Sequence, residues 1–141
     1  FQGEPRRLAT AKSVGAAVPA LSTSVLWELR LVSKPEVSLT VAPGRKPPPE
    51  AAFAGIARFR VPTAGRYRVT VDGPFWIDVL RNGQALAPLD FMGHLDCPPI
   101  HKAVEYELPA GEPLTLQLTA AARDTARIVI LSSARTARLK N

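Results

Sequence analysis

Short runs of alternating apolar and polar residues recur along most of this chain, and turn-forming residues separate them. In residues 114–118 leucines alternate with threonine and glutamine, and in residues 103–108 Val104, Tyr106 and Leu108 alternate with glutamates. Successive side chains of a β-strand point to opposite faces of its sheet, so this period of two predicts strands with one buried face.

The same reasoning predicts further strands at residues 25–32, 37–41, 56–61, 67–71, 75–80 and 127–131. Gly65, which can adopt positive φ, predicts that the third and fourth of these runs form a hairpin, and Asn82-Gly83 is typical of a two-residue hairpin turn. About eight short strands, with turn signals roughly every 8 to 12 residues, predict an all-β fold. We expect an antiparallel β-sandwich that resembles a jelly roll.

The length of 141 residues and the hydrophobic content of 46% suit one domain with a core of its own. We expect the sandwich to span residues 24–134 and a basic tail to occupy residues 135–141. Residues 4–23 are expected to form an N-terminal arm, which is either mobile or holds a short helix near residues 8–17. Residues 1–3 look like the remnant of an engineered protease recognition site.

An engineered start suggests that a signal peptide preceded the native part, so we expect a periplasmic or secreted protein. No run of apolar residues is long enough to span a bilayer as a helix. The net charge is +6, with basic residues near both ends. This charge is explained either by solubility or by an acidic partner.

From Phe59 onward the order of strands and turns resembles a known family. The residues concerned are Phe-Arg-Val-Pro at 59–62, Gly-Arg-Tyr-Arg-Val-Thr-Val at 65–71, Trp-Ile-Asp-Val-Leu at 76–80, Asn-Gly-Gln-Ala-Leu at 82–86, Leu-Pro-Ala-Gly at 108–111 and Leu-Thr-Leu-Gln-Leu at 114–118. Over residues 53–131 the chain resembles bacterial pre-peptidase C-terminal-like β-sandwich modules and related carbohydrate-binding jelly rolls. The resemblance implies an exported, non-catalytic accessory or binding domain. Those modules often bind calcium through paired aspartates, whereas the matching strand here has one acid, Asp78.

All soft or borderline metal ligands of the chain lie between residues 92 and 102. They are Met92, His94, Cys97 and His101, and Asp96 lies beside them. Imidazole, thiolate and thioether groups suit Cu(I), and the set without methionine suits Zn(II). The segment therefore predicts a possible copper or zinc site.

Three alternatives to a metal site remain open for the same segment. Cys97 can be a small buried residue next to surface histidines, or it can link two chains in a disulfide-bonded dimer. It can also act as a nucleophile with His94 or His101 as its base, which would make the protein an enzyme.

Four arginines are predicted on the outward face of the hairpin: Arg58, Arg60, Arg66 and Arg68. In that hairpin Arg60 and Arg68 would lie nearly opposite each other, which is destabilising unless the charges are neutralised. Glu105 and Glu107, on another outward face, are the simplest partners. The alternative is an anionic ligand, such as an acidic glycan, a lipid phosphate or an acidic protein. Nucleic acid fits less well, because aromatic residues make up only 6% of the chain and none interleaves with these arginines on the outer face.

Trp27 and Trp76 could stack on sugars, but both lie among apolar residues and are expected to pack in the core. The leading hypothesis is an exported binding or scaffold domain whose ligand is an unknown protein or glycan. The alternatives are a small periplasmic copper- or zinc-binding protein and an enzyme that depends on Cys97.

Overall fold

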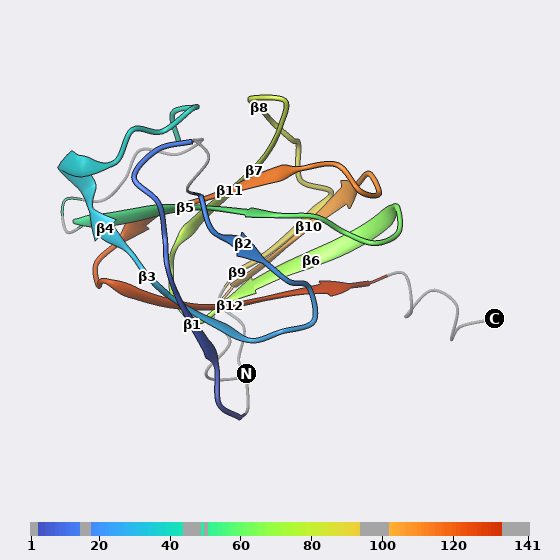
Figure 1. Cartoon of the computed structure of the whole chain (residues 1–141), viewed down its shortest axis with the longest axis horizontal. Helices are drawn as coiled ribbons and strands as arrows, with labels where there is room; N and C mark the ends of the chain where they lie inside the picture. Colours follow the sequence, from blue (N-terminus) through green and yellow to red (C-terminus); the bar gives the residue numbers. More distant parts are fainter. Residues whose placement is uncertain (1–2, 15–17, 44–48, 50, 94–101, 134–141) are drawn as a thin grey trace.

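The computed structural model describes residues 3–14, 18–43, 49, 51–93 and 102–133, with the backbone alone for 91–93. Within them the chain forms two β-sheets packed face to face (Figure 1). The first sheet, sheet A, contains β1 (Arg6–Ala9), β3 (Trp27–Arg30), β12 (Thr125–Ser132), β6 (Gly65–Val71), β10 (Lys102–Leu108) and β9 (Asp90–Gly93), in that order. The second sheet, sheet B, contains β2 (Ala20–Leu21), β5 (Phe53–Phe59), β11 (Leu114–Ala121), β7 (Trp76–Arg81) and β8 (Gln84–Ala85), and β4 (Val32–Ser33) also pairs with β5.

The central strand orders, β3-β12-β6-β10 and β5-β11-β7-β8, define a jelly roll. The chain passes from one sheet to the other on either side of β2 and also between β3 and β4, β5 and β6, β6 and β7, β8 and β9, β10 and β11, and β11 and β12. The all-β, jelly-roll-like sandwich predicted from the sequence is confirmed. The structure adds short edge strands to the expected set, and two of them, β1 and β2, pair in parallel with their neighbours.

The core lies between the sheets and consists of the alternate side chains of each strand that point toward the opposite sheet. Leu114, Leu116 and Leu118 of β11 are almost fully buried, as are Val104 and Tyr106 of β10. The alternation in the sequence therefore identified the buried face of these strands correctly. The Asn82-Gly83 turn is confirmed as well, since both residues have positive φ and join β7 to β8.

The predicted hairpin of residues 56–61 and 67–71 is wrong. Both runs are strands, but β5 belongs to one sheet and β6 to the other, so residues 60–64 cross the edge of the sandwich. Their apolar faces meet across the core instead of lying side by side on one sheet. A connection of this length can span the roughly 10 Å between packed sheets as readily as it can close a hairpin.

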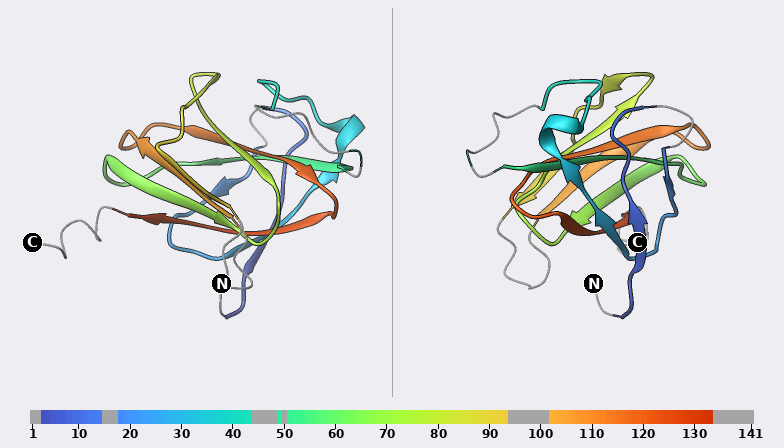
Figure 2. Two further views of the ribbon diagram at one scale, coloured as in Figure 1. Left: turned by 180° about the vertical axis from the view of Figure 1, so that it is seen from behind. Right: turned by 60° about the vertical axis from the view of Figure 1, so that its left-hand side comes forward.

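The helix considered near residues 8–17 is also wrong where the structure describes this segment. Residues 6–9 form β1, and the Thr10 N–H donates to the Arg30 carbonyl at 3.0 Å. Ala11 then exchanges backbone hydrogen bonds with Ile56 of sheet B, at 2.8 and 3.2 Å. Figures 1 and 2 show this segment running along the side of the sandwich from one sheet to the other.

The strand predicted at residues 37–41 is absent. A 3-10 turn, η1 (Lys34–Glu36), follows β4, and irregular chain then covers the outer face of sheet B. Its backbone bonds to a side chain instead of a strand: the Thr40 N–H donates to Oε1 of Gln117 at 3.0 Å, and Nε2 of Gln117 donates to the Val41 carbonyl at 3.2 Å. Among the described residues, no helix is long and apolar enough to cross a membrane.

Candidate functional site

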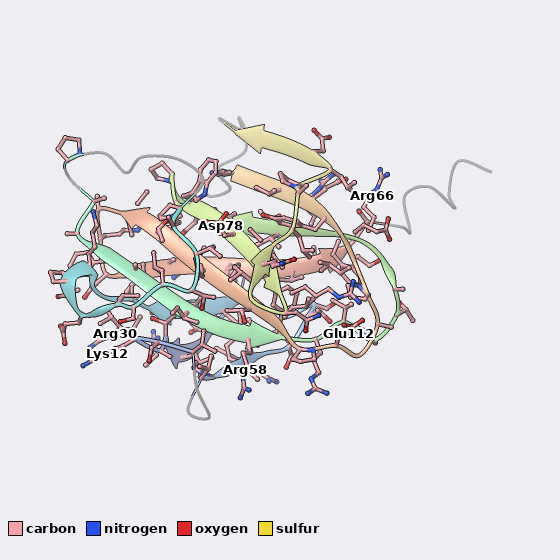
Figure 3. The ribbon with its side chains drawn as sticks, turned by 90° about the horizontal axis from the view of Figure 1, so that it is seen from above. Lys12, Arg30, Arg58, Arg66, Asp78 and Glu112 are labelled. Carbon is pink, nitrogen blue, oxygen red and sulfur yellow. The ribbon has the colours of Figure 1, made fainter. Side chains whose placement is uncertain are left out.

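The four arginines predicted to share one face lie on two different sheets. Arg58 belongs to β5 and Arg60 follows it, whereas Arg66 and Arg68 belong to β6. Figure 3 shows Arg58 and Arg66 on opposite sides of the molecule. Arg60 and Arg68 are therefore not cross-strand neighbours, and the repulsion expected between them does not arise.

Arg68 is paired with a carboxylate within the protein, and Arg66 lies at the edge of the same ion pair. Nη2 of Arg68 lies 2.7 Å from Oε2 of Glu105, which is its register partner on β10. Nη1 of Arg66 lies 4.0 Å from the other oxygen of the same carboxylate. Glu105 is only 5% exposed. The predicted pairing with Glu105 is thus confirmed, while Glu107 stands opposite Arg66 in the register and is exposed.

Arg58 and Arg60 are held differently, by backbone carbonyls. Nη2 of Arg58 donates to the Val18 carbonyl at 3.2 Å, and Nη1 of Arg60 donates to the Gly111 carbonyl at 3.5 Å. In the part of the chain that the structure describes, neither forms an ion pair with a carboxylate. A guanidinium has several N–H donors and keeps its charge at all physiological pH values, so each retains charge and unused donors.

These two arginines line a groove of about 700 Å³. The end of β5 and the residues after it form the floor, β2 and the residues after it form one wall, and the turn between β10 and β11 forms the other. Its lining residues are Ala20, Leu21, Ser22, Thr23, Arg58, Phe59, Arg60, Val61, Pro62, Gly111 and Pro113, and we call it the arginine groove. Its volume lies within the range of small-ligand sites, roughly 300 to 1,000 Å³.

No aromatic ring is open to the arginine groove among its lining residues. Phe59 is the one aromatic residue of the set and is 1% exposed. Trp27 is buried and donates its indole N–H to the Ser22 carbonyl at 3.1 Å, which ties the β2 wall to the core. Trp27 therefore packs in the core, as expected. Trp76, on β7, is only partly buried and is not part of the core cluster, so the prediction that it packs in the core is wrong. Its ring faces the ammonium of Lys102 at 4.6 Å.

A second groove, of about 460 Å³, provides a contrast. It is lined by Arg7 and Arg30, but also by Glu28. The Glu28 carboxylate lies 3.2 Å from Arg7 and 3.5 Å from Arg127, so the arginine charge in this groove is partly compensated. The two grooves therefore differ in charge: the second groove contains a carboxylate, Glu28, beside its arginines.

The predicted metal ligands His94, Asp96, Cys97 and His101 lie outside the described residues. Met92 is on β9, where it is the register partner of Ala103. Within the described part of the chain, no group of three or more histidine, cysteine, aspartate or glutamate residues could hold a metal ion. The copper or zinc site, the Cys97-linked dimer and the Cys97 nucleophile stay predictions.

The walls of the arginine groove could not be found from the sequence. Residues 20–23 fall in the expected N-terminal arm, and Gly111 and Pro113 lie between the strands predicted at 103–108 and 114–118. Neither segment has a pattern that links it to Arg58, because the pairing of β2 with β5 depends on contacts between distant parts of the chain. The chain matches no protein-family model and no curated protein sequence.

Proposed function

We propose that this chain is an exported, non-catalytic β-sandwich domain that binds an anionic ligand in the arginine groove. The observation that carries the proposal is the contrast between two arginine pairs. Arg66 and Arg68 share a buried carboxylate, whereas Arg58 and Arg60 face a groove and, within the described part of the chain, bond to carbonyl oxygens and to no carboxylate. The resemblance of residues 53–131 to exported binding modules supports the same class of function.

The chemistry of the groove suits carboxylate, sulfate or phosphate groups. Hydrogen bonds from guanidinium to an oxyanion are roughly twice as strong as neutral ones, and the planar fork can donate two at once. The carbonyls of Val18 and Gly111 fix part of each side chain in advance, which lowers the entropy lost on binding. Ser22 and Thr23 add hydroxyl groups at the wall.

Retention on immobilised heparin, a general polyanion, tests the proposal. The variant Arg58→Gln/Arg60→Gln should elute at clearly lower salt than the wild type. Arg7→Gln/Arg30→Gln is the matched control, because it removes the same charge from the groove that already contains Glu28, and it should elute close to the wild type. Equal elution of the two double variants would mean that net charge alone explains retention, and the proposal would be wrong.

A further inference from the structure

We infer that the natural ligand of the arginine groove is an acidic peptide segment in extended conformation, with carboxylates two residues apart. This inference rests on the proposed function and narrows its ligand class. Arg58 and Arg60 are two residues apart and lie on one face of an extended segment, which places their Cα atoms about 6.6 to 6.8 Å apart. An extended peptide has the same period, so acidic residues at positions i and i+2 face both arginines together.

The edge of β2 that faces away from β5, beside the groove, also offers backbone hydrogen bonds. β2 is the terminal strand of sheet B and pairs in parallel with β5, with the Arg58 N–H donating to the Pro19 carbonyl at 2.8 Å. A parallel pair uses alternate residues of each strand, so the N–H and carbonyl of Ala20 point away from β5. Ala20 lines the groove. Backbone groups on the open edge of a strand are a known site for the addition of a peptide strand.

The walls favour a peptide over a glycan. Sugar rings bind preferentially against the open faces of aromatic side chains, and no lining residue of the groove presents one. The side chains next to the arginines on β2 are instead small: Ala20 is the register partner of Arg58, and Ser22 lies one alternate position further on. Small side chains leave room for a peptide backbone to approach the strand.

Two peptide isomers of identical composition test this inference on the full chain. One is acetyl-Thr-Glu-Val-Glu-Thr-amide, and the other is acetyl-Thr-Glu-Glu-Val-Thr-amide, in which an extended backbone directs the two carboxylates to opposite faces. In titration calorimetry the alternating isomer should bind about tenfold more tightly, which corresponds to one lost charge-assisted contact. Arg58→Gln/Arg60→Gln should abolish the difference, and Arg7→Gln/Arg30→Gln should preserve it.

N-methylated peptides test the backbone contacts. In an extended peptide the amides of the two glutamates point to one side and that of the central valine points to the other. Either methylation of the two glutamate amides or methylation of the valine amide should weaken binding strongly, and methylation on the opposite side should have little effect. Equal effects of both would contradict pairing with β2.

The outcomes separate the inference from the proposed function. If heparin retention depends on Arg58 and Arg60 but the two isomers bind equally, or if only a heparin oligosaccharide binds, the peptide inference is wrong and the anion site stands. If neither retention nor peptide binding depends on these arginines, both are wrong.

Discussion

At the scale of single residues, the setting of an arginine decides its role more than its position in a strand pattern does. Arg58 and Arg68 both project outward from strands with alternating sequences. Arg68 lies beside β10 and meets Glu105 at 2.7 Å. Arg58 lies between β11 and β2, where its register partners are Thr115 and Ala20. The sequence shows both arginines, but only the pairing of strands shows which one lies beside a carboxylate.

Tyr106 leads to a prediction about pH. Burial raises the pKa of Tyr106 above its ordinary value, and the nearby Asp78 carboxylate raises it further. Its hydroxyl donates to the Ile77 carbonyl at 3.4 Å. Because the folded-state pKa is raised, the unfolded chain loses this proton first, near pH 10. The contribution of Tyr106 to the free energy of unfolding should therefore not change with pH below about pH 10, and it should fall above that pH.

Urea unfolding of the wild type and Tyr106→Phe, between about pH 9 and pH 11.5, measures this effect. The wild type should lose up to about 1.4 kcal/mol more per pH unit than the variant above pH 10. The comparison removes the contributions of all other ionisable groups, because they are present in both proteins. Parallel stability curves for the two proteins would show that Tyr106 does not resist ionisation in the folded state.

At the scale of elements, the sequence predicted strands better than it predicted their partners. Residues 102–108 and 114–121 form strands whose buried face follows from alternation alone. The partner of β5 could not be predicted, because five residues can either close a hairpin or cross the sandwich. Residues 37–41 alternate like a strand and yet form none, because the side chain of Gln117 occupies their backbone groups. The candidate site was predicted in part: Arg58 and Arg60 were identified, and the walls around them were not.

Gln117 provides the test of this loop arrangement. It is completely buried on the outer face of β11 and bonds to both Thr40 and Val41. The substitution Gln117→Leu keeps the approximate volume but leaves a backbone donor and a backbone acceptor without these partners. We expect a loss of about 1 to 3 kcal/mol in the free energy of unfolding. The amide of Thr40 should also lose its protection from hydrogen exchange.

Thr115→Val is the control for Gln117→Leu, because Thr115 lies two residues away on the same face of β11. It should change stability by much less and leave the exchange rate of Thr40 unaltered. Unchanged exchange at Thr40 in Gln117→Leu would show that the loop is held by other contacts.

At the scale of the whole molecule, the N-terminal residues connect the two sheets. β1 pairs with β3 in sheet A, Ala11 bonds to Ile56 in sheet B, and β2 then extends sheet B. This path closes one side of the sandwich, and β2 also builds one wall of the arginine groove. Thr10 packs so tightly over Gly55 that a Cβ at that glycine would clash with the Thr10 side chain. The jelly roll and the proposed site thus depend on the same segment.

The central claim is that anions bind at the arginine groove rather than over the basic surface in general. It is tested most directly by NMR, following the side-chain Nε–Hε signals of all arginines while a short heparin oligosaccharide is added. The signals of Arg58 and Arg60 should shift together and saturate, while those of Arg66 and Arg68 stay in place. Shifts spread evenly over the arginines, or confined to Arg7 and Arg30, would contradict the claim.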